Sequence, residues 1–476
     1  MLRDSRLGAI SKDVLEFLSS REPDKKIFQA DLLVDRAHLI MLKEQGWVSA
    51  EECSTIIETL AGIEESELGE AEDIAEAIEG YVLAKMGPQG GRMHTGRSRN
   101  DKVATSIRLA LREEMLGLMD EQLSLIGTLV ELAGKHTDSV MPGFTHTQHA
   151  QPTTLAHYLM SYADAFLRDL NRLEEAYRRV NLSPLGAAAF ASTGFKIDRL
   201  RTCRLLGFDG LVENSMDAVS TRDFILEVLA DLSIHMVNLS RLSEEIVLWS
   251  TQEFGYIELD NLFASTSSIM PQKKNPDTAE IARAKTGSVL GSLISALAIL
   301  KALPMSYNRD LQEVTPHLWR GMDWTRGTVR ILDGCLSTMK FNEKLMEERS
   351  GEGFSTATEL ADVLVRKMGI PFRTAHRIVG RLAAGSSLPT FEELEAVTLE
   401  MAGLKPGECG MSAVDLAKAL DPRSNVAVRA GTGGPSPAET ARMIEERRGT
   451  LARQARKTAE LRARAEEAVK ALLAMR

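Results

Sequence analysis

The chain has 476 residues, 44% of them hydrophobic and 26% charged, and its 57 basic and 67 acidic side chains give a formal net charge of −10 at pH 7. This composition is typical of a soluble globular protein and excludes a globally disordered chain or a broad nucleic-acid binder. Only 5% of the residues are aromatic, and prolines are absent from residues 185–270 and 438–476, which favours long helices.

The cysteines and the N-terminus indicate the cellular compartment. The four cysteines stand far apart without a C-x-x-C pair, which indicates neither a disulfide framework nor a cysteine-rich zinc site: Cys53, Cys203, Cys335 and Cys409. Charges throughout residues 1–17 leave no apolar core for a signal peptide, and the uncharged run at residues 286–300 is shorter than the ~20 residues that span a bilayer. We expect a cytoplasmic protein with neither a membrane nor a nucleic-acid partner.

Residues 44–84 contain twelve acidic side chains and no lysine or arginine. Ile56, Ile57, Leu60 and Ile63 lie at helical spacing among them, which predicts a solvated helix pair. An acidic docking surface is the alternative.

Residues 211–254 contain neither glycine nor proline. Apolar residues recur there every three or four positions, at Ile225, Val228, Leu229, Leu232, Met236, Leu239, Leu242 and Ile246. The pattern predicts one amphipathic helix, on the order of 40–60 Å long at 1.5 Å per residue. A helix of that length belongs in a bundle or an oligomer.

Two further helix starts carry capping patterns. Asp277 with Glu280 resembles a capping box, and Ser436 is followed by Pro437 and Glu439 before a helical run to the C-terminus. We therefore expect a nearly all-α chain with three parts: an N-terminal helical domain (1–110), a central long-helix domain (111–350) and a C-terminal helical domain (351–476).

Three polar segments interrupt the helical pattern, and the first is HTGRSRND at residues 94–101. With Gly91 it differs by one substitution from a P-loop, but no strand is predicted before it, which argues against a nucleotide triphosphate site. Arg97, Ser98, Arg99 and Asn100 could together hold carboxylates or phosphates.

The second segment is MPGFTHTQHAQP at residues 141–152. The spacing of His146 and His149 does not match a helical metal pair, and no cysteine is near. Thr145 and its polar neighbours are residues that orient substrates and imidazoles, so His146 is either catalytic or a hydrogen-bonded structural histidine.

The third segment is STSSIMPQKKNPD at residues 265–277. It gathers Ser267, Ser268, Lys273, Lys274 and Asn275 directly before a helix. Donors beside a possible nucleophile or base are what an active-site loop requires, and the apolar residues 269–271 in its middle are expected to be buried.

These segments resemble the fumarase/aspartase superfamily, whose signature is S-S-x-M-P-x-K-x-N-P. The form MPQKKNP, together with HTGRSRND and T-H-x-Q-x-A-Q-P, is most similar to the argininosuccinate lyases. NSMDAVSTRDF (214–224) and YNRDLQE (307–313) add two matches in the same order.

The resemblance implies an all-α fumarase/aspartase-type fold whose long central helices form a bundle in a homotetramer, with each active site shared between subunits. It also implies β-elimination of argininosuccinate to arginine and fumarate, the last step of arginine biosynthesis, without a metal or an organic cofactor. Another fumarate-releasing lyase of the superfamily and a catalytically silent, crystallin-like structural protein are the alternatives.

By the same resemblance, Ser267 is the base, and Lys273 and Asn275 bind the carboxylate whose charge grows in the transition state. His146, paired with Glu280, transfers the proton to the leaving group. The other implied residues contact the succinate carboxylates (Ser98, Asn100 and Thr145) or the arginine end of the substrate (Ser20, Asp24, Arg99, Tyr307 and Gln312).

The chain departs from the family pattern at four positions. Ala75 replaces a histidine, Thr315 a lysine, His149 an arginine and Thr266 a glycine. The Thr315 change removes a cation for the amino-acid carboxylate, which Arg309 or Arg320 could replace.

Overall fold

The computed structural model describes residues 8, 10–385 and 387–475. The α-helices of this described part are, in chain order, α1 (Lys12–Leu18), α2 (Arg21–Asp24), α3 (Phe28–Glu44), α4 (Ala50–Ala61), α5 (Ile74–Met86), α6 (Arg99–Lys135), α7 (Leu155–Val180), α8 (Arg199–Leu205), α9 (Ser215–Ser220), α10 (Asp223–Trp249), α11 (Asp277–Leu300), α12 (Leu311–Thr338), α13 (Glu343–Ser350), α14 (Ala357–Met368), α15 (Phe372–Ala383), α16 (Phe391–Ala402), α17 (Ala413–Leu420), α18 (Pro422–Val428) and α19 (Pro437–Ala474).

Short elements connect these helices. The 3-10 helices are η1 (Lys25–Ile27), η2 (Glu65–Glu67), η3 (Gly87–His94), η4 (Asn261–Phe263), η5 (Glu352–Phe354) and η6 (Gly407–Cys409). The strands are β1 (Val140–Thr145), β2 (Gln148–Thr154), β3 (Leu182–Ser183), β4 (Gly210–Leu211), β5 (Ile257–Glu258), β6 (Ser265–Thr266), β7 (Lys274–Asn275) and β8 (Lys340–Phe341). They pair as β1 with β2, β5 with β8 and β6 with β7, all antiparallel, and β3 with β4, parallel. The all-α prediction is confirmed.

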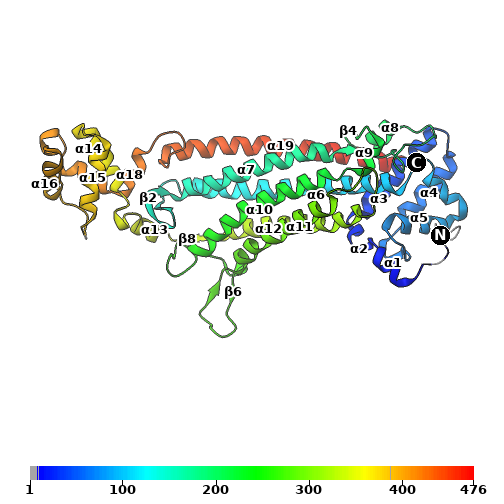
Figure 1. Ribbon diagram of the computed structural model, residues 1–476, viewed down its shortest axis with the longest axis horizontal. Helices are drawn as coiled ribbons and strands as arrows, with labels where there is room; N and C mark the ends of the chain where they lie inside the picture. The colour runs from blue at the N-terminus through cyan, green and yellow to red at the C-terminus, as the bar shows by residue number, and fades with distance from the viewer. Residues whose placement is uncertain (1–7, 9, 386, 476) are drawn as a thin grey trace.

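Five long helices form the body of the molecule. α6, α7, α10, α11 and α12 lie side by side along its long axis, and α19 runs along α6 (Figure 1). The N-terminal helices and the C-terminal end of α19 lie at one end, whereas α14 to α18 lie at the other. No helix in the described residues is both long and apolar enough to cross a membrane.

One hydrophobic core runs through the N-terminal helices and the bundle, and α14 to α17 enclose a second. The second core is built from residues such as Leu360, Leu364, Ile378 and Leu416. α19 belongs to the first core through Met443, Ile444 and Leu472. The division into 1–110, 111–350 and 351–476 stays a prediction, and α6 passes through position 110 without interruption.

The predicted helix over residues 211–254 is wrong in one respect, because it is two helices. All eight of its periodic apolar residues are buried as predicted, but they belong to α10, which begins only at Asp223. Asn214 caps α9 by accepting from Met216 N and Asp217 N. At the first residue of α10, Asp223 Oδ1 accepts from Thr221 Oγ1 at 2.6 Å and from Phe224 N at 2.7 Å. These polar side chains divide the helix because they compete for backbone hydrogen bonds.

The other predicted helix starts have mixed outcomes. α4 and α5 form the expected acidic helices. Ser436 caps α19 by accepting from Glu439 N, and α19 ends at Ala474, whereas Arg476 lies outside the described residues. The capping box predicted at Asp277 is wrong: α11 has no side-chain cap, and Asp277 instead accepts a hydrogen bond from Ser265 Oγ.

Candidate active site

The predicted site residues fall into three groups on different parts of the chain. The N-terminal group comprises Ser20, Asp24, Ser98, Arg99, Asn100, Tyr307 and Gln312. The hairpin group comprises Thr145 and His146, and the loop group comprises Ser267, Lys273, Asn275 and Glu280.

In the N-terminal group, Ser20 and Asp24 form a buried pair. Ser20 Oγ donates to Asp24 Oδ2 at 2.7 Å, and the backbone N–H of Ile74 donates to the same oxygen at 3.3 Å. Asp24 is 5% exposed. Burial raises its pKa to about 7, and the negative charges of Asp73 and Asp31 act in the same direction. Asp24 can therefore change its protonation state at neutral pH.

Ser98, Arg99 and Asn100 lie at the N-terminus of α6. Ser98 Oγ accepts from Asn100 N at 3.3 Å, and Asp101 Oδ1 accepts from Ser98 N at 3.1 Å, which completes a capping box. Arg99 Nη1 donates to Asp73 Oδ2 at 2.7 Å. The N-terminus of a 37-residue helix carries a positive partial charge, so this end suits a carboxylate.

The segment before α12 joins the same group. Gln312 Nε2 donates to Leu18 O at 3.1 Å, and Arg309 Nη2 donates to Leu18 O at 2.9 Å and to Glu72 Oε2 at 3.0 Å. Burial raises the pKa of Tyr307, and the positive charges of Arg222, Arg309 and Arg99 oppose that rise. The fold thus brings residues from four distant stretches of sequence into one neighbourhood.

Arg97 does not join this group, although it precedes Ser98 directly. Its side chain is 1% exposed, and its Nη1 lies 2.7 Å from Asp35 Oδ1 in the interior. The prediction that Arg97 faces a substrate anion is therefore wrong. A 3-10 helix, η3, rather than a strand, precedes the segment, which also differs from a P-loop.

The hairpin group lies at the tip of the β1–β2 hairpin, whose turn contains two residues. Thr145 pairs with Gln148, and His146 and Thr147 form the turn with φ of 55° and 57°. Both lie in the left-handed region, which costs free energy for residues other than glycine and is common at functional sites. The His146 side chain is exposed.

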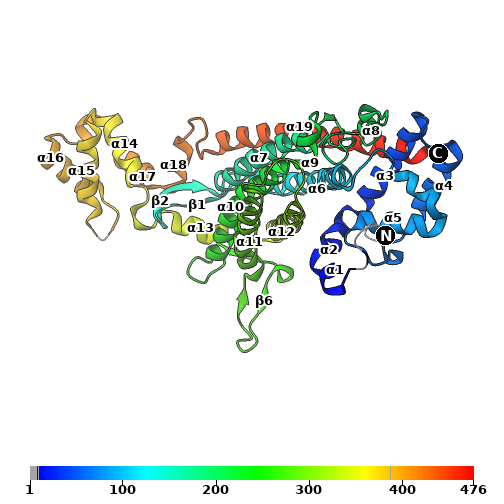
Figure 2. The same ribbon diagram turned by 45° about the vertical axis from the view of Figure 1, so that its right-hand side comes forward.

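Ser267, Lys273 and Asn275 of the loop group lie on a projecting hairpin formed by β6, residues 267–273 and β7 (Figure 2), whereas Glu280 lies in the first turn of α11. Ser267 Oγ accepts from the backbone N–H groups of Ile269 at 3.3 Å and Met270 at 3.0 Å. The prediction that residues 269–271 are buried is wrong, because Ile269 is 83% exposed and Met270 42%. The backbone of these residues forms the Ser267 turn, and their side chains are exposed at the loop tip.

A cavity of ≈ 660 Å³ adjoins this loop, and Lys273, Asn275 and Glu280 are among its lining residues. Lys274 also lines this cavity, but its Nζ already donates to Leu259 O at 2.5 Å and to Glu258 Oε1 at 3.2 Å. Within the described part of the chain, Lys273 makes no ion pair, which leaves its charge free for a ligand.

The groups lie far apart within one chain. α6 separates the N-terminal group from the hairpin group and is about 55 Å long at 1.5 Å per residue. Among the described residues, the histidines that form ion pairs are His94, His136 and His235, so His146 has no carboxylate partner there, Glu280 included. A single chain therefore does not bring all three groups to one small molecule.

The predicted site residues do not include two carboxylates that lie in the N-terminal group. Glu72 accepts from Arg309, and Asp73 accepts from Arg99 and caps α5 by accepting from Glu76 N at 2.7 Å. The sequence signal for Asp73 was its position before a helical run, which indicates a cap and says nothing about a distant arginine.

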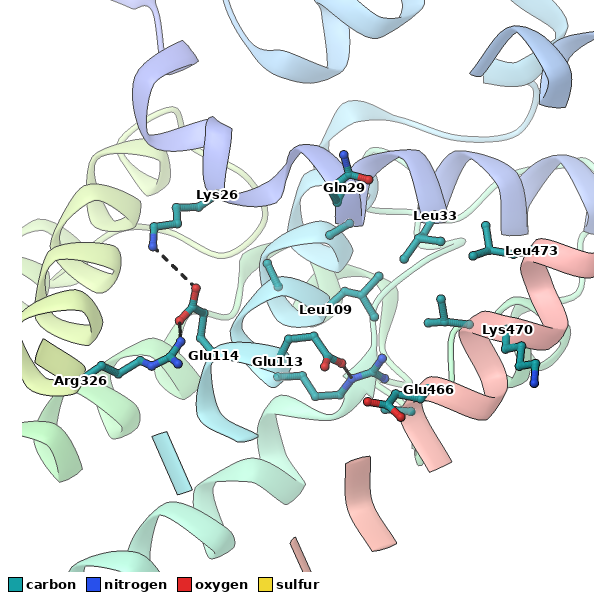
Figure 3. A pocket seen from close by; sticks show the side chains of 15 residues that line it. Lys26, Gln29, Leu33, Leu109, Glu113, Glu114, Arg326, Glu466, Lys470 and Leu473 are labelled. Atoms are coloured by element: carbon teal, nitrogen blue, oxygen red, sulfur yellow. Dashed lines mark hydrogen bonds and ion pairs between the residues drawn. The ribbon is translucent and has the colours of Figure 1, made fainter. Parts of the chain in front are cut away.

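A second large cavity lies elsewhere. Its volume is ≈ 610 Å³, and it lies between α3, α6, α12 and α19 (Figure 3). Glu114 forms ion pairs there with Lys26 and Arg326. None of its lining residues belongs to the three groups, so cavity volume alone does not locate the predicted site.

Comparisons with known proteins place the chain among lyases. A family model described as Lyase matches residues 60–291, and one described as Argininosuccinate lyase C-terminal matches residues 354–427. The chain is 58% identical to the argininosuccinate lyase of Methanothrix thermoacetophila over 99% of this chain and 98% of that protein. It is 53% identical to the argininosuccinate lyase of Methanococcoides burtonii over 95% and 93%.

Solved structures agree with the fold. The crystal structure of EDDS lyase in complex with formate has a TM-score of 0.89 and 35% identity, over 94% of this chain and 90% of that one. A fumarate lyase from Mesorhizobium sp. BNC1 has a TM-score of 0.74 and 20% identity, over 91% and 97%, which supports the fold alone. The long-helix architecture is therefore that of the fumarase/aspartase superfamily.

Proposed function

Because the chain belongs to the argininosuccinate lyase family, we propose that it cleaves argininosuccinate by β-elimination, releasing arginine and fumarate in arginine biosynthesis. The chain is a lyase. The reaction must remove a weakly acidic C–H proton, stabilise the carboxylate that gains charge, and protonate the departing nitrogen.

The environment of Ser267 is the observation that carries this proposal. A free serine hydroxyl is far too weak a base at neutral pH. Two backbone N–H groups point at Ser267 Oγ, at 3.3 and 3.0 Å, and such donors stabilise negative charge on the oxygen. Closure of the loop over a substrate would exclude water and strengthen these interactions. Ser267 is then the base.

The remaining roles follow from charge and position. Lys273 and Asn275 stabilise the growing carboxylate charge, and His146 protonates the leaving nitrogen with Glu280 from a neighbouring subunit as its partner. Ser98, Asn100 and Thr145 bind the succinate carboxylates. The acidic surroundings of Arg99, Tyr307 and Gln312, with Ser20 and Asp24, suit the cationic arginine end.

We also propose a homotetramer that acts in the cytoplasm. The separation along α6 supports shared sites, because the N-terminal and hairpin groups meet only if different chains supply them. α11 supports an oligomer as well: its buried residues are mostly small, while Ile281, Leu290, Ile294 and Leu297 are 37–64% exposed. Free thiols at all four cysteines fit a reducing compartment.

The direct test is to incubate the protein with argininosuccinate and follow fumarate by its ultraviolet absorbance. We expect fumarate and arginine in equal amounts. An inactive protein, or one that turns over adenylosuccinate, malate or aspartate instead, would contradict the proposed substrate. A solved EDDS lyase variant with bound fumarate is 33% identical to this chain. The assay should therefore also include other substrates that would release fumarate and an amine.

The Ser267→Ala variant tests the base. We expect kcat to fall by roughly 10²–10⁴-fold with little change in substrate binding, because the base acts in the transition state. Ser268→Ala, the neighbouring hydroxyl in the same loop, is the matched control and should retain near wild-type kcat. Equal kcat in Ser267→Ala and wild type would remove Ser267 from this role.

A further inference from the structure

Beneath the N-terminal group lies a fully buried cluster of four charges, referred to here as the ion cluster: Asp31, Asp35, Arg97 and Lys102. Lys102 Nζ lies 2.7 Å from Asp31 Oδ2 and 2.9 Å from Asp35 Oδ2, and Arg97 Nη1 lies 2.7 Å from Asp35 Oδ1. Ser106 Oγ donates to Asp31 Oδ1 at 2.7 Å. Two carboxylates thus balance two cations across the contact between α3 and α6.

As a contact between two helices, the ion cluster carries a large desolvation cost. Buried charges lose hydration, and replacing a buried ion pair by apolar residues of similar size is often neutral or stabilising. Arg97 is the costliest member, because within the described residues its Nε and Nη2 have no hydrogen-bond partner. Stability therefore does not explain why an arginine lies at this position.

Its place in the chain offers an explanation, since Arg97 lies directly before Ser98, Arg99 and Asn100. Its inward ion pair fixes the backbone that carries those three partly exposed side chains. The flanking residues are tied down as well. His38 Nε2 lies 2.8 Å from Thr95 O, and burial together with the Arg97 charge lowers the pKa of His38 to about 3, so the neutral ring donates this hydrogen bond.

Asp101 fixes the other side of the segment. Its Oδ1 accepts from Ser98 N, and its Oδ2 accepts from the backbone N–H groups of Gly186 and Ala188, both at 2.9 Å. Residues 95–101 are thus anchored to α3 beneath and to residues 186–188 beside them. The outward side chains at positions 98–100 have little freedom to shift.

We propose that the ion cluster, through the Arg97–Asp35 pair, positions the substrate-binding segment 98–100, and that Arg97 is a positioning residue for the succinate carboxylates. This inference rests on the proposed function for the identity of the substrate. It assigns to Arg97 a role that involves no contact with substrate.

The test replaces the pair by apolar residues in the double variant Asp35→Leu/Arg97→Met, which leaves Lys102 paired with Asp31. We expect an unchanged oligomeric mass and an equal or higher Tm, but a KM for argininosuccinate raised about tenfold or more, with a smaller change in kcat. Hydrogen–deuterium exchange of the amides at 95–100 should be faster. The matched control is Asp169→Leu/His235→Leu, a buried pair between α7 and α10 with Nδ1 3.1 Å from Oδ2, which should leave KM and this exchange unchanged.

Wild-type KM and wild-type exchange in a folded double variant would overturn the proposal. If the double variant does not fold, the Arg97→Lys variant is the test. It keeps the positive charge but not the planar guanidinium group, so KM and the exchange rate of the amides at 95–100 should both rise at unchanged Tm. Unchanged values would again overturn it. The exchange measurement needs no turnover, so it tests the role of Arg97 even if the wild-type protein does not cleave argininosuccinate. Lack of cleavage by the wild-type protein would contradict the proposed function instead.

Discussion

Asp24 is a single buried carboxyl group whose ionisation costs stability. Its folded-state pKa of about 7 lies above the ordinary value of 3.8, chiefly because the carboxyl is buried. Between these two values the folded protein binds a proton that the unfolded chain has released. The contribution of Asp24 to stability is therefore greatest below pH 3.8 and falls as pH rises through this window, by up to about 4 kcal/mol at ~1.36 kcal/mol per unit of pKa.

We predict that Asp24→Asn is more stable than wild type at pH 8 and nearly equal to it at pH 4, because the amide carries no charge to bury. Thermal melts at pH 4 to 8 check this through the difference in Tm. KM for argininosuccinate should rise, since a cationic group of the substrate loses its carboxylate.

Asp415→Asn is the control for this pH series. Hydrogen bonds from Ser412 and Lys367 lower the pKa of Asp415 to about 2, so its contribution to stability is complete above pH 3.8 and is lost as pH falls toward 2. Its Tm difference from wild type should stay constant between pH 5 and 8. A constant difference for Asp24→Asn as well would show that its pKa is not raised.

At this scale, sequence motifs located the polar segments but did not predict which way each side chain points. Arg99 pairs with Asp73 and lies near Tyr307, whereas Arg97, two residues earlier, points inward to Asp35. Its direction depends on a carboxylate 62 positions away on another helix. No local periodicity carries that information.

Among the elements, α11 has an unusual distribution of side chains. Its buried positions are Ala279, Ala282, Thr286, Val289, Ser292 and Ala296, while larger apolar residues face outward. Small residues let α10 and α12 approach closely, and an apolar outer stripe is unfavourable in water. A second copy of the chain would cover this stripe.

We predict that Ile294→Lys, at a position 64% exposed, lowers the oligomeric mass measured by light scattering and reduces activity, because it places a charge in the proposed interface. Val414→Lys is the matched control, with 63% exposure on α17 and the same introduced side chain. It should leave both quantities unchanged. An Ile294→Lys protein with wild-type mass would place the interface elsewhere.

Periodicity predicted the long elements and missed the short ones. The eight buried positions of α10 follow directly from apolar spacing, because one face of a long helix must meet a core. The β1–β2 hairpin was missed because its turn uses His146 and Thr147 at positive φ, where glycine or asparagine is usual. The break before α10 coincides with side-chain hydrogen bonds of Thr221 and Asp223 rather than with glycine or proline.

For the whole molecule, the decisive feature is the distance between the groups. The N-terminal group and the hairpin group lie at opposite ends of α6, about 55 Å apart along the helix, which is far longer than a single argininosuccinate molecule. Motif order along the sequence could not reveal this, because order carries no distance. The resemblance implies shared sites, and the length of α6 supplies an independent physical reason for them.

Mixed oligomers test this arrangement directly. We predict that co-expression of His146→Asn chains with Arg99→Ala chains restores activity that neither variant has alone. If one chain supplies Arg99 and another supplies His146, random assembly of equal amounts leaves about a quarter of the sites with both residues intact. If one chain supplied both residues, every site would contain one defect.

Differently tagged chains allow the mixed oligomers to be purified. Each variant expressed alone is the control, and the rate of fumarate release is the measurement. Mixed oligomers no more active than the single variants would show that the two groups do not serve a common site.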